Sequence, residues 1–194
     1  MLTSINPLGE RARNQSFGIT ATAYVAGSTL AGAALGALLG ALGAPLAHGR
    51  VVVGFIAVAA LGGVLVDARG RVPGPRRQVN EDWLATYRGW VYGAGFGGQL
   101  GLAFVTIVAG SVTWIAFVCA LGAGSSAAGL VVGATFGLVR ALPVLMMART
   151  FTPHALRVRV ARLERARPRF TRALTVGQLL VAAGLLAVVV GSMA

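Results

Sequence analysis

Long apolar runs alternate with arginine-rich segments along this chain. The longest uncharged run, Trp90–Leu121, spans 32 residues without Asp, Glu, Arg or His. Because about 20 apolar residues suffice to cross a bilayer as a helix, this run is long enough to span a membrane. Further apolar runs extend over residues 17–47, 51–66, 127–147 and 173–194. The pattern predicts an all-α, polytopic transmembrane helix bundle that forms a single integral membrane domain over residues 1–194.

Arginines between the runs set the predicted topology. Five lie within residues 69–88 and eight within residues 149–172, so the positive-inside rule places both segments in the cytoplasm, together with an N-terminus that carries Arg11 and Arg13. Two cytoplasmic segments are separated by an even number of crossings, so Trp90–Leu121 crosses once and must tilt, protrude or break. The prediction is five spans, with the C-terminus outside. Splitting this run would give six spans but would place one basic segment outside.

Glycines recur at four-residue spacing in three of the runs. Small residues at this spacing allow two helix backbones to approach closely in lipid, where no hydrophobic effect drives helix association. We therefore predict helix packing through Gly32, Gly36, Gly40, Gly93, Gly97, Gly101, Gly129, Gly133 and Gly137.

Residues 152–169 have the pattern of an amphipathic helix on the cytoplasmic surface, followed by a final transmembrane helix over residues 173–194. Leu156, Val160 and Leu163 share one face of the first helix, and its arginines lie mostly elsewhere. Such a helix binds anionic lipid headgroups, and docking onto an acidic partner protein would use the same surface. Lipid contacts are assigned to Arg157, Arg159, Arg162 and Arg165.

Two pairs of short segments indicate an internal duplication. TAYVAG resembles WVYGAG, and DARGRVP resembles MARTFTP. These pairs predict parallel repeat units over residues 17–75 and 85–155, with binding sites of transporters typically lying where repeats meet. Chance similarity between glycine- and alanine-rich segments is the alternative.

Arg140, Asp67 and Gln99 are the candidate functional residues. An arginine within an apolar span costs at least ~2.5 kcal/mol unless it snorkels or pairs. Asp67 is the acidic residue at the margin of a span and is therefore the natural salt-bridge partner of Arg140. A structural ion pair, snorkelling and contact with an anionic substrate all remain open for Arg140. For Gln99 an interhelical hydrogen bond is favoured over a ligand contact.

Composition excludes several function classes. The net charge of +12 would indicate nucleic-acid binding in a soluble protein, but the positive-inside rule explains it here, so we expect no nucleic-acid partner. Cys119 is the single cysteine, which leaves no disulfide and no cysteine metal cluster. No catalytic constellation occurs in the spans, so we expect no enzyme activity, no cofactor and no metal site.

Overlong glycine-rich opening helices, duplicated units and a basic central loop resemble small membrane transporters of the LysE/CcdA type. CcdA-type proteins carry reducing equivalents across the membrane through a pair of membrane-embedded cysteines. Because Cys119 stands alone, the resemblance implies a transport scaffold without the thiol relay. The predicted function is transport of a small solute across a bacterial cytoplasmic (inner) membrane. The alternative is a non-catalytic accessory subunit of a larger membrane complex. Either function accommodates a homo-oligomer or partner membrane subunits.

Overall fold

The chain is helical in every part that the structure describes. The computed structural model describes residues 4–46, 49–70, 82–103 and 110–191, which form helices and no β-strand. Most of the predicted basic connection, residues 71–81, lies outside the described residues. In chain order the elements are α1 (Pro7–Ala12), α2 (Phe17–Gly43), the 3₁₀ turn η1 (Ala44–Leu46), α3 (Gly49–Ala68), α4 (Trp83–Thr86), α5 (Gly89–Leu102), α6 (Val112–Gly122), α7 (Ser126–Ala141), the 3₁₀ turn η2 (Leu142–Met147) and α8 (Pro153–Gly191). The all-α prediction is confirmed.

Four segments of the described chain are long and apolar enough to cross a membrane. They are Phe17–Leu46, Val51–Ala68, Ser126–Met147 and Pro153–Val188. Their length and composition match the roughly 20 apolar residues that a bilayer crossing requires. These helices indicate a membrane protein, as the sequence predicts.

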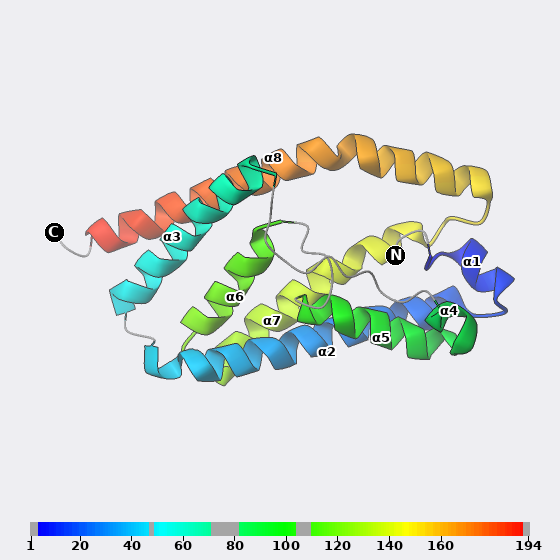
Figure 1. The fold of residues 1–194 in the computed structure, drawn as a ribbon, viewed down its shortest axis with the longest axis horizontal. Helices are drawn as coiled ribbons and strands as arrows, with labels where there is room; N and C mark the ends of the chain where they lie inside the picture. Colours follow the sequence, from blue (N-terminus) through cyan, green and yellow to red (C-terminus); the bar gives the residue numbers. More distant parts are fainter. Residues whose placement is uncertain (1–3, 47–48, 71–81, 104–109, 192–194) are drawn as a thin grey trace.

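The run Trp90–Leu121 is divided between two shorter helices. α5 ends at Leu102 and α6 begins at Val112. With 14 and 11 residues, neither helix reaches the length of a full crossing. The two helices follow each other in the same direction along the molecule, from right to left in Figure 1. The sequence predicted that this overlong run tilts, protrudes or breaks, and in the structure it is broken into two helices.

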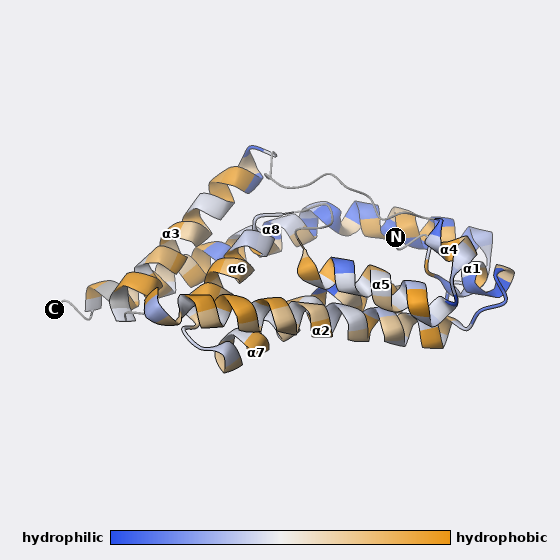
Figure 2. Cartoon of the chain, turned by 60° about the horizontal axis from the view of Figure 1, so that its bottom comes forward, coloured by the Kyte–Doolittle hydropathy of each residue, from blue (hydrophilic) through white to orange (hydrophobic). Residues whose placement is uncertain are grey.

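The C-terminal region differs from the predicted pair of helices, residues 152–169 and 173–194. α8 is continuous over 39 residues and contains Pro168. At 1.5 Å per residue it is about 58 Å long, well beyond the ~30 Å thickness of a hydrocarbon core. The predicted surface helix and final span are therefore two sections of one helix. Figure 2 shows that hydrophilic residues concentrate in its first section.

α2 is the centre of the bundle and packs against α5 on one side and α7 on the other. All nine glycines predicted to pack helices lie at these contacts, where an added Cβ would meet backbone atoms of a neighbouring helix. A Cβ at Gly36, for example, would overlap the carbonyl oxygen of Gly129, and one at Gly101 would overlap that of Ser28. The glycines thus allow three helix backbones to lie in direct contact.

A buried apolar cluster lies at the end of this layer where α1 covers it, on the right of Figure 1. Tyr24 from α2, Tyr92 and Phe96 from α5, and Ile5 from the N-terminal segment belong to it. Trp83 of α4 stacks on Phe96 with ring centroids 5.8 Å apart. α1 and α4 therefore close this end of the bundle.

α3, α6 and the second section of α8 form the other group of packed helices. α3 contacts both α8 and α6, and α6 contacts α2 and α7. Figure 1 shows α8 extending along the whole molecule above the layer formed by α5, α2 and α7.

Candidate functional site

The C-terminal end of α5 forms one side of the candidate site. The last carbonyl groups of a helix lack partners within the helix, and α5 ends where Ala103 adopts a positive φ of 59°. The carbonyl of Leu100 accepts a hydrogen bond from the Ala103 amide at 3.1 Å and another from Arg140 Nη1 at 3.2 Å. Arg140 therefore places a positive charge at the negative end of the α5 dipole.

Arg140 belongs to the last turn of α7, so it lies at the C-terminal ends of two helices at once. Its guanidinium carbon is 5.4 Å from the ring centroid of Phe136, one turn earlier on the same helix. These contacts explain how a half-buried arginine is accommodated in an apolar helix. A guanidinium has five N–H donors, and the hydrogen bond to Leu100 uses one of them.

Asp67 holds the other end of the break, the N-terminus of α6. Its Oδ1 accepts a hydrogen bond from the Ser111 amide at 2.9 Å, and its Oδ2 accepts one from the Ser111 hydroxyl at 2.7 Å. Ser111 Oγ in turn accepts a hydrogen bond from Gln178 Nε2 at 3.0 Å. A carboxylate at a helix N-terminus satisfies unpaired amides and interacts favourably with the dipole. Asp67 thus ties α3, α6 and α8 together.

The predicted salt bridge between Asp67 and Arg140 is not formed among the described residues. The physical reason is the broken helix between them: each charge has an opposite helix end as its nearer partner. Arg140 caps the end of α5 and Asp67 caps the start of α6. The two residues still belong to one site because they line the same cavity.

This cavity lies between α3, the start of α6, α7 and α8, and has a volume of about 760 Å³. Small-molecule sites typically measure about 300–1,000 Å³. Asp67 and Arg140 line it together with Thr113 of α6, while α8 contributes one helical face that includes Arg167 and Leu174. Charged groups of both signs and apolar side chains therefore surround a space of ligand size.

Gln99, the third candidate, does not join this site. It is half-buried on α5, it is not among the residues lining the cavity, and its side chain forms no hydrogen bond with a described residue. Sequence reasoning missed Ser111, although its position after Gly110 in the middle of an overlong run is a signal for a helix break. It also missed Arg167, which looked like one of many surface arginines.

The arginines assigned to lipid headgroups lie on the first section of α8. Arg157, Arg162 and Arg165 are exposed, whereas Arg159 is half-buried and donates a hydrogen bond to the carbonyl of Met146. Val160 and Leu163, from the predicted apolar face, line the cavity. The apolar face of this section is thus directed at the bundle.

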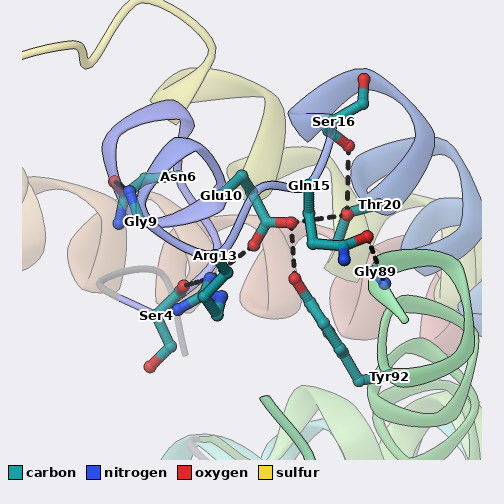
Figure 3. A network of polar contacts seen from close by, with 10 residues as sticks. All are labelled: Ser4, Asn6, Gly9, Glu10, Arg13, Gln15, Ser16, Thr20, Gly89 and Tyr92. Atoms are coloured by element: carbon teal, nitrogen blue, oxygen red, sulfur yellow. Dashed lines mark hydrogen bonds and ion pairs between the residues drawn. The ribbon is translucent and has the colours of Figure 1, made fainter. Parts of the chain in front are cut away.

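A second polar site, which the sequence did not predict, lies beneath α1 (Figure 3). Glu10 is completely buried. Its Oε1 pairs with Arg13 Nη2 at 2.5 Å, and its Oε2 accepts hydrogen bonds from the hydroxyls of Thr20 at 2.7 Å and Tyr92 at 2.5 Å. One carboxylate therefore connects α1, α2 and α5. The sequence had indicated only a polar N-terminal arm.

Arg13 completes the Glu10 cluster. Its guanidinium donates to the carbonyl of Ser4 at 2.8 Å and lies 5.7 Å from the ring centroid of Tyr92. Burial acts to lower the pKa of Arg13, but its hydrogen bond to Glu10 and the charge of that carboxylate outweigh burial, so the pKa lies above its ordinary value. Arg13 therefore stays charged, and the cluster is a stable ion pair that fastens α1 to the bundle.

Replacing Ser111 tests the link between the helix break and α3. We expect Ser111→Ala to lower the free energy of unfolding by about 1–3 kcal/mol, because the half-buried Asp67 carboxylate and the buried Gln178 amide each lose a partner. Thermal unfolding of the purified protein in mild detergent measures this change. Thr135→Ala is the control, since that exposed hydroxyl bonds only to the Val131 carbonyl of its own helix. Equal unfolding curves for the two variants would contradict the role of Ser111.

No protein-family model, no curated protein and no solved structure matches the chain.

Proposed function

We propose that this protein is a small transporter-like membrane protein that binds its solute in the cavity between α3, α7 and α8. The observation that supports this most is the interrupted helix. α6 begins at the cavity, and the two charged residues that cap the end of α5 and the start of α6, Arg140 and Asp67, both line it. Discontinuous helices are a recurrent feature of secondary transporters, whose binding sites lie where such helices are interrupted.

The topology proposed for transport has five crossings, with α5 and α6 together making the third. The N-terminus then lies in the cytoplasm and the membrane is the bacterial cytoplasmic (inner) membrane. The internal duplication and the resemblance to LysE/CcdA-type transporters stay predictions. In the proposed duplication α2 corresponds to the α5–α6 pair, but α2 is unbroken. The helix break, and the site beside it, would then belong to the second repeat unit only.

Accessibility from the two sides of the membrane tests transport without knowledge of the solute. In a Cys119→Ala background, we expect Val112→Cys, which lines the cavity within the third crossing, to react with a membrane-impermeant maleimide in both right-side-out and inside-out vesicles. Alternating access exposes the binding site to each side in turn. Mass spectrometry of the labelled protein measures the reacted fraction.

Two control positions define the expected limits of this experiment. Arg149→Cys, an exposed position just after η2, should react from one side only. Val181→Cys, exposed in the uncharged section of α8, should react from neither side because it faces hydrocarbon. Reaction of Val112→Cys from one side only would contradict a transport function.

A specific observation favours the accessory-subunit function as the second candidate. Gly177, Gly184 and Gly191 of α8 have open space at the position of an added Cβ, unlike the glycines packed around α2. A partner membrane subunit or a second copy of the chain would cover this face. Native mass measurement after extraction in gentle detergent distinguishes a stoichiometric complex, which supports this function, from a monomer, which contradicts it.

A further inference from the structure

Two guanidinium groups face the cavity from opposite helices. Arg140 lines it from α7 and Arg167 lines it from α8. Within the described residues neither forms an ion pair; the pair found there is Glu10–Arg13. Two acidic residues also line the cavity: Asp67 already accepts two hydrogen bonds from Ser111, and Glu164 is exposed and forms no ion pair with a described residue. Guanidinium groups bind carboxylates and phosphates through charge-assisted, often bidentate hydrogen bonds, so the cavity favours an anionic group.

The cavity is apolar on the side that faces the uncharged section of α8. Beyond Arg172 this helix has no charged residue up to Gly191. Phe170 and Leu174 of α8 line this part of the cavity, together with Phe136 of α7. The part of the cavity lined by Arg140 and Arg167 thus borders an apolar part, which continues toward the hydrocarbon of the membrane.

These two sections together define a ligand class. A small hydrated anion would satisfy the arginines but would leave the aromatic and aliphatic wall in contact with water, which is unfavourable. An uncharged lipid would cover that wall but would leave the half-buried Arg140 without an anion, which is also costly. A molecule with an anionic head and a hydrocarbon chain meets both requirements.

We propose that the cavity binds an anionic lipid, with its headgroup between Arg140 and Arg167 and its hydrocarbon chain along Phe170 and Leu174. This inference rests on the proposed function, because it concerns the same cavity that is proposed to bind the solute. The lipid enters from the side of the uncharged section of α8, which the cavity reaches at Leu174. The open shape of the cavity and its position beside the uncharged section of α8 suit such an entry.

Photolabelling of the full chain tests this assignment. The protein is placed in phosphatidylcholine nanodiscs with a fatty acid that carries a diazirine in its chain, and labelled peptides are identified by mass spectrometry. We expect saturable labelling of the segment that contains Phe170 and Leu174. Excess oleate should suppress it at about tenfold lower concentration than oleyl alcohol, since the charged head contributes hydrogen bonds to the arginines. Inorganic phosphate should not suppress it.

Substitutions test whether the two arginines bind the lipid headgroup. Arg167→Gln should reduce labelling about tenfold. The side chain of this exposed residue has no hydrogen bond to a described residue, so the variant should fold normally. Arg140→Gln should do the same, and its unfolding temperature shows whether the end of α5 remains capped. Arg149→Gln, away from the cavity, should label like the natural chain.

Other outcomes separate this proposal from the proposed function. Suppression by inorganic phosphate as effective as by oleate would overturn the lipid and identify a soluble anion, while transport would stand. Equal suppression by oleyl alcohol, or unchanged labelling of both arginine variants, would overturn the anionic head. One-sided reaction of Val112→Cys together with arginine-dependent lipid labelling would contradict transport but retain the lipid site.

Discussion

We expect Glu10→Ala to lower the free energy of unfolding by about 3–5 kcal/mol, the range observed when one partner of a buried ion pair is removed. The loss has two parts. Arg13 would keep its charge without a partner, and the buried hydroxyl of Tyr92 would lose its acceptor. The hydroxyl of Thr20 is less affected because it also donates to the Ser16 carbonyl at 3.1 Å. The side chain of Arg13 is 26% exposed, so partial hydration favours the lower end of the range.

Thermal unfolding in mild detergent measures the effect of Glu10→Ala, and limited trypsin digestion locates it. If Glu10 fastens α1, cleavage after Arg11 and Arg13 should become faster before the rest of the chain opens. Glu164→Ala is the matched control, because Glu164 is exposed and forms no ion pair with a described residue. Similar unfolding temperatures and cleavage rates in the two variants would show that the cluster does not stabilise the bundle.

Gly36→Val should produce the second large effect, a separation of α2 from α7. An added Cβ at Gly36 would overlap the Gly129 carbonyl and lie within 3 Å of the Gly133 backbone. Backbone cannot move aside as a flexible side chain can, so we expect a loss at the upper end of the about 1–3 kcal/mol typical of overpacking. Close approach of small residues is also what stabilises helix pairs in lipid, so the variant weakens the remaining contacts.

Gly62→Val is the control for Gly36→Val, because it makes the same chemical change on α3 where no atom lies within 4 Å of an added Cβ. The unfolding temperature, and the fraction of protein that elutes as a single species in gel filtration, should both decrease for Gly36→Val but not for Gly62→Val. Loss of stability in both variants would indicate an effect of valine on helix propensity rather than on helix contact.

The long apolar runs could be predicted because helix formation in a membrane depends on local composition. Residues 17–46 and 126–147 have enough apolar side chains to be recognised without any tertiary contact. The glycine spacing at Gly129 and Gly133 is also local, because residues four apart share one face of a helix. Which face packs against which helix is not local, and the contact between Gly129 and Gly36 joins two runs that the spacing alone does not pair.

The helix break and its charged caps could be predicted only in part. The length of Trp90–Leu121 predicted that this run does not cross the membrane as one straight helix, but a tilted helix would also have fitted that length. The break depends on Arg140, 40 residues after Leu100, and on Asp67, 44 residues before Ser111. The sequence suggested that Asp67 pairs with Arg140, because they are opposite charges near the ends of apolar runs. In the folded chain, the end of α5 and the start of α6 lie close to these charges and bind them instead.

The sequence by itself determined the helical class, the apolar segments, the glycine faces and the arginines that flank the membrane segments, because each of these depends on residues close together in the chain. The tertiary structure alone decided that Glu10 is buried beneath α1, that α8 continues through Pro168, and that Arg140 and Arg167 face one cavity. The physical reason is that burial and electrostatic partners are set by which helices meet. A charge finds its lowest free energy among groups that the fold brings together from distant parts of the chain.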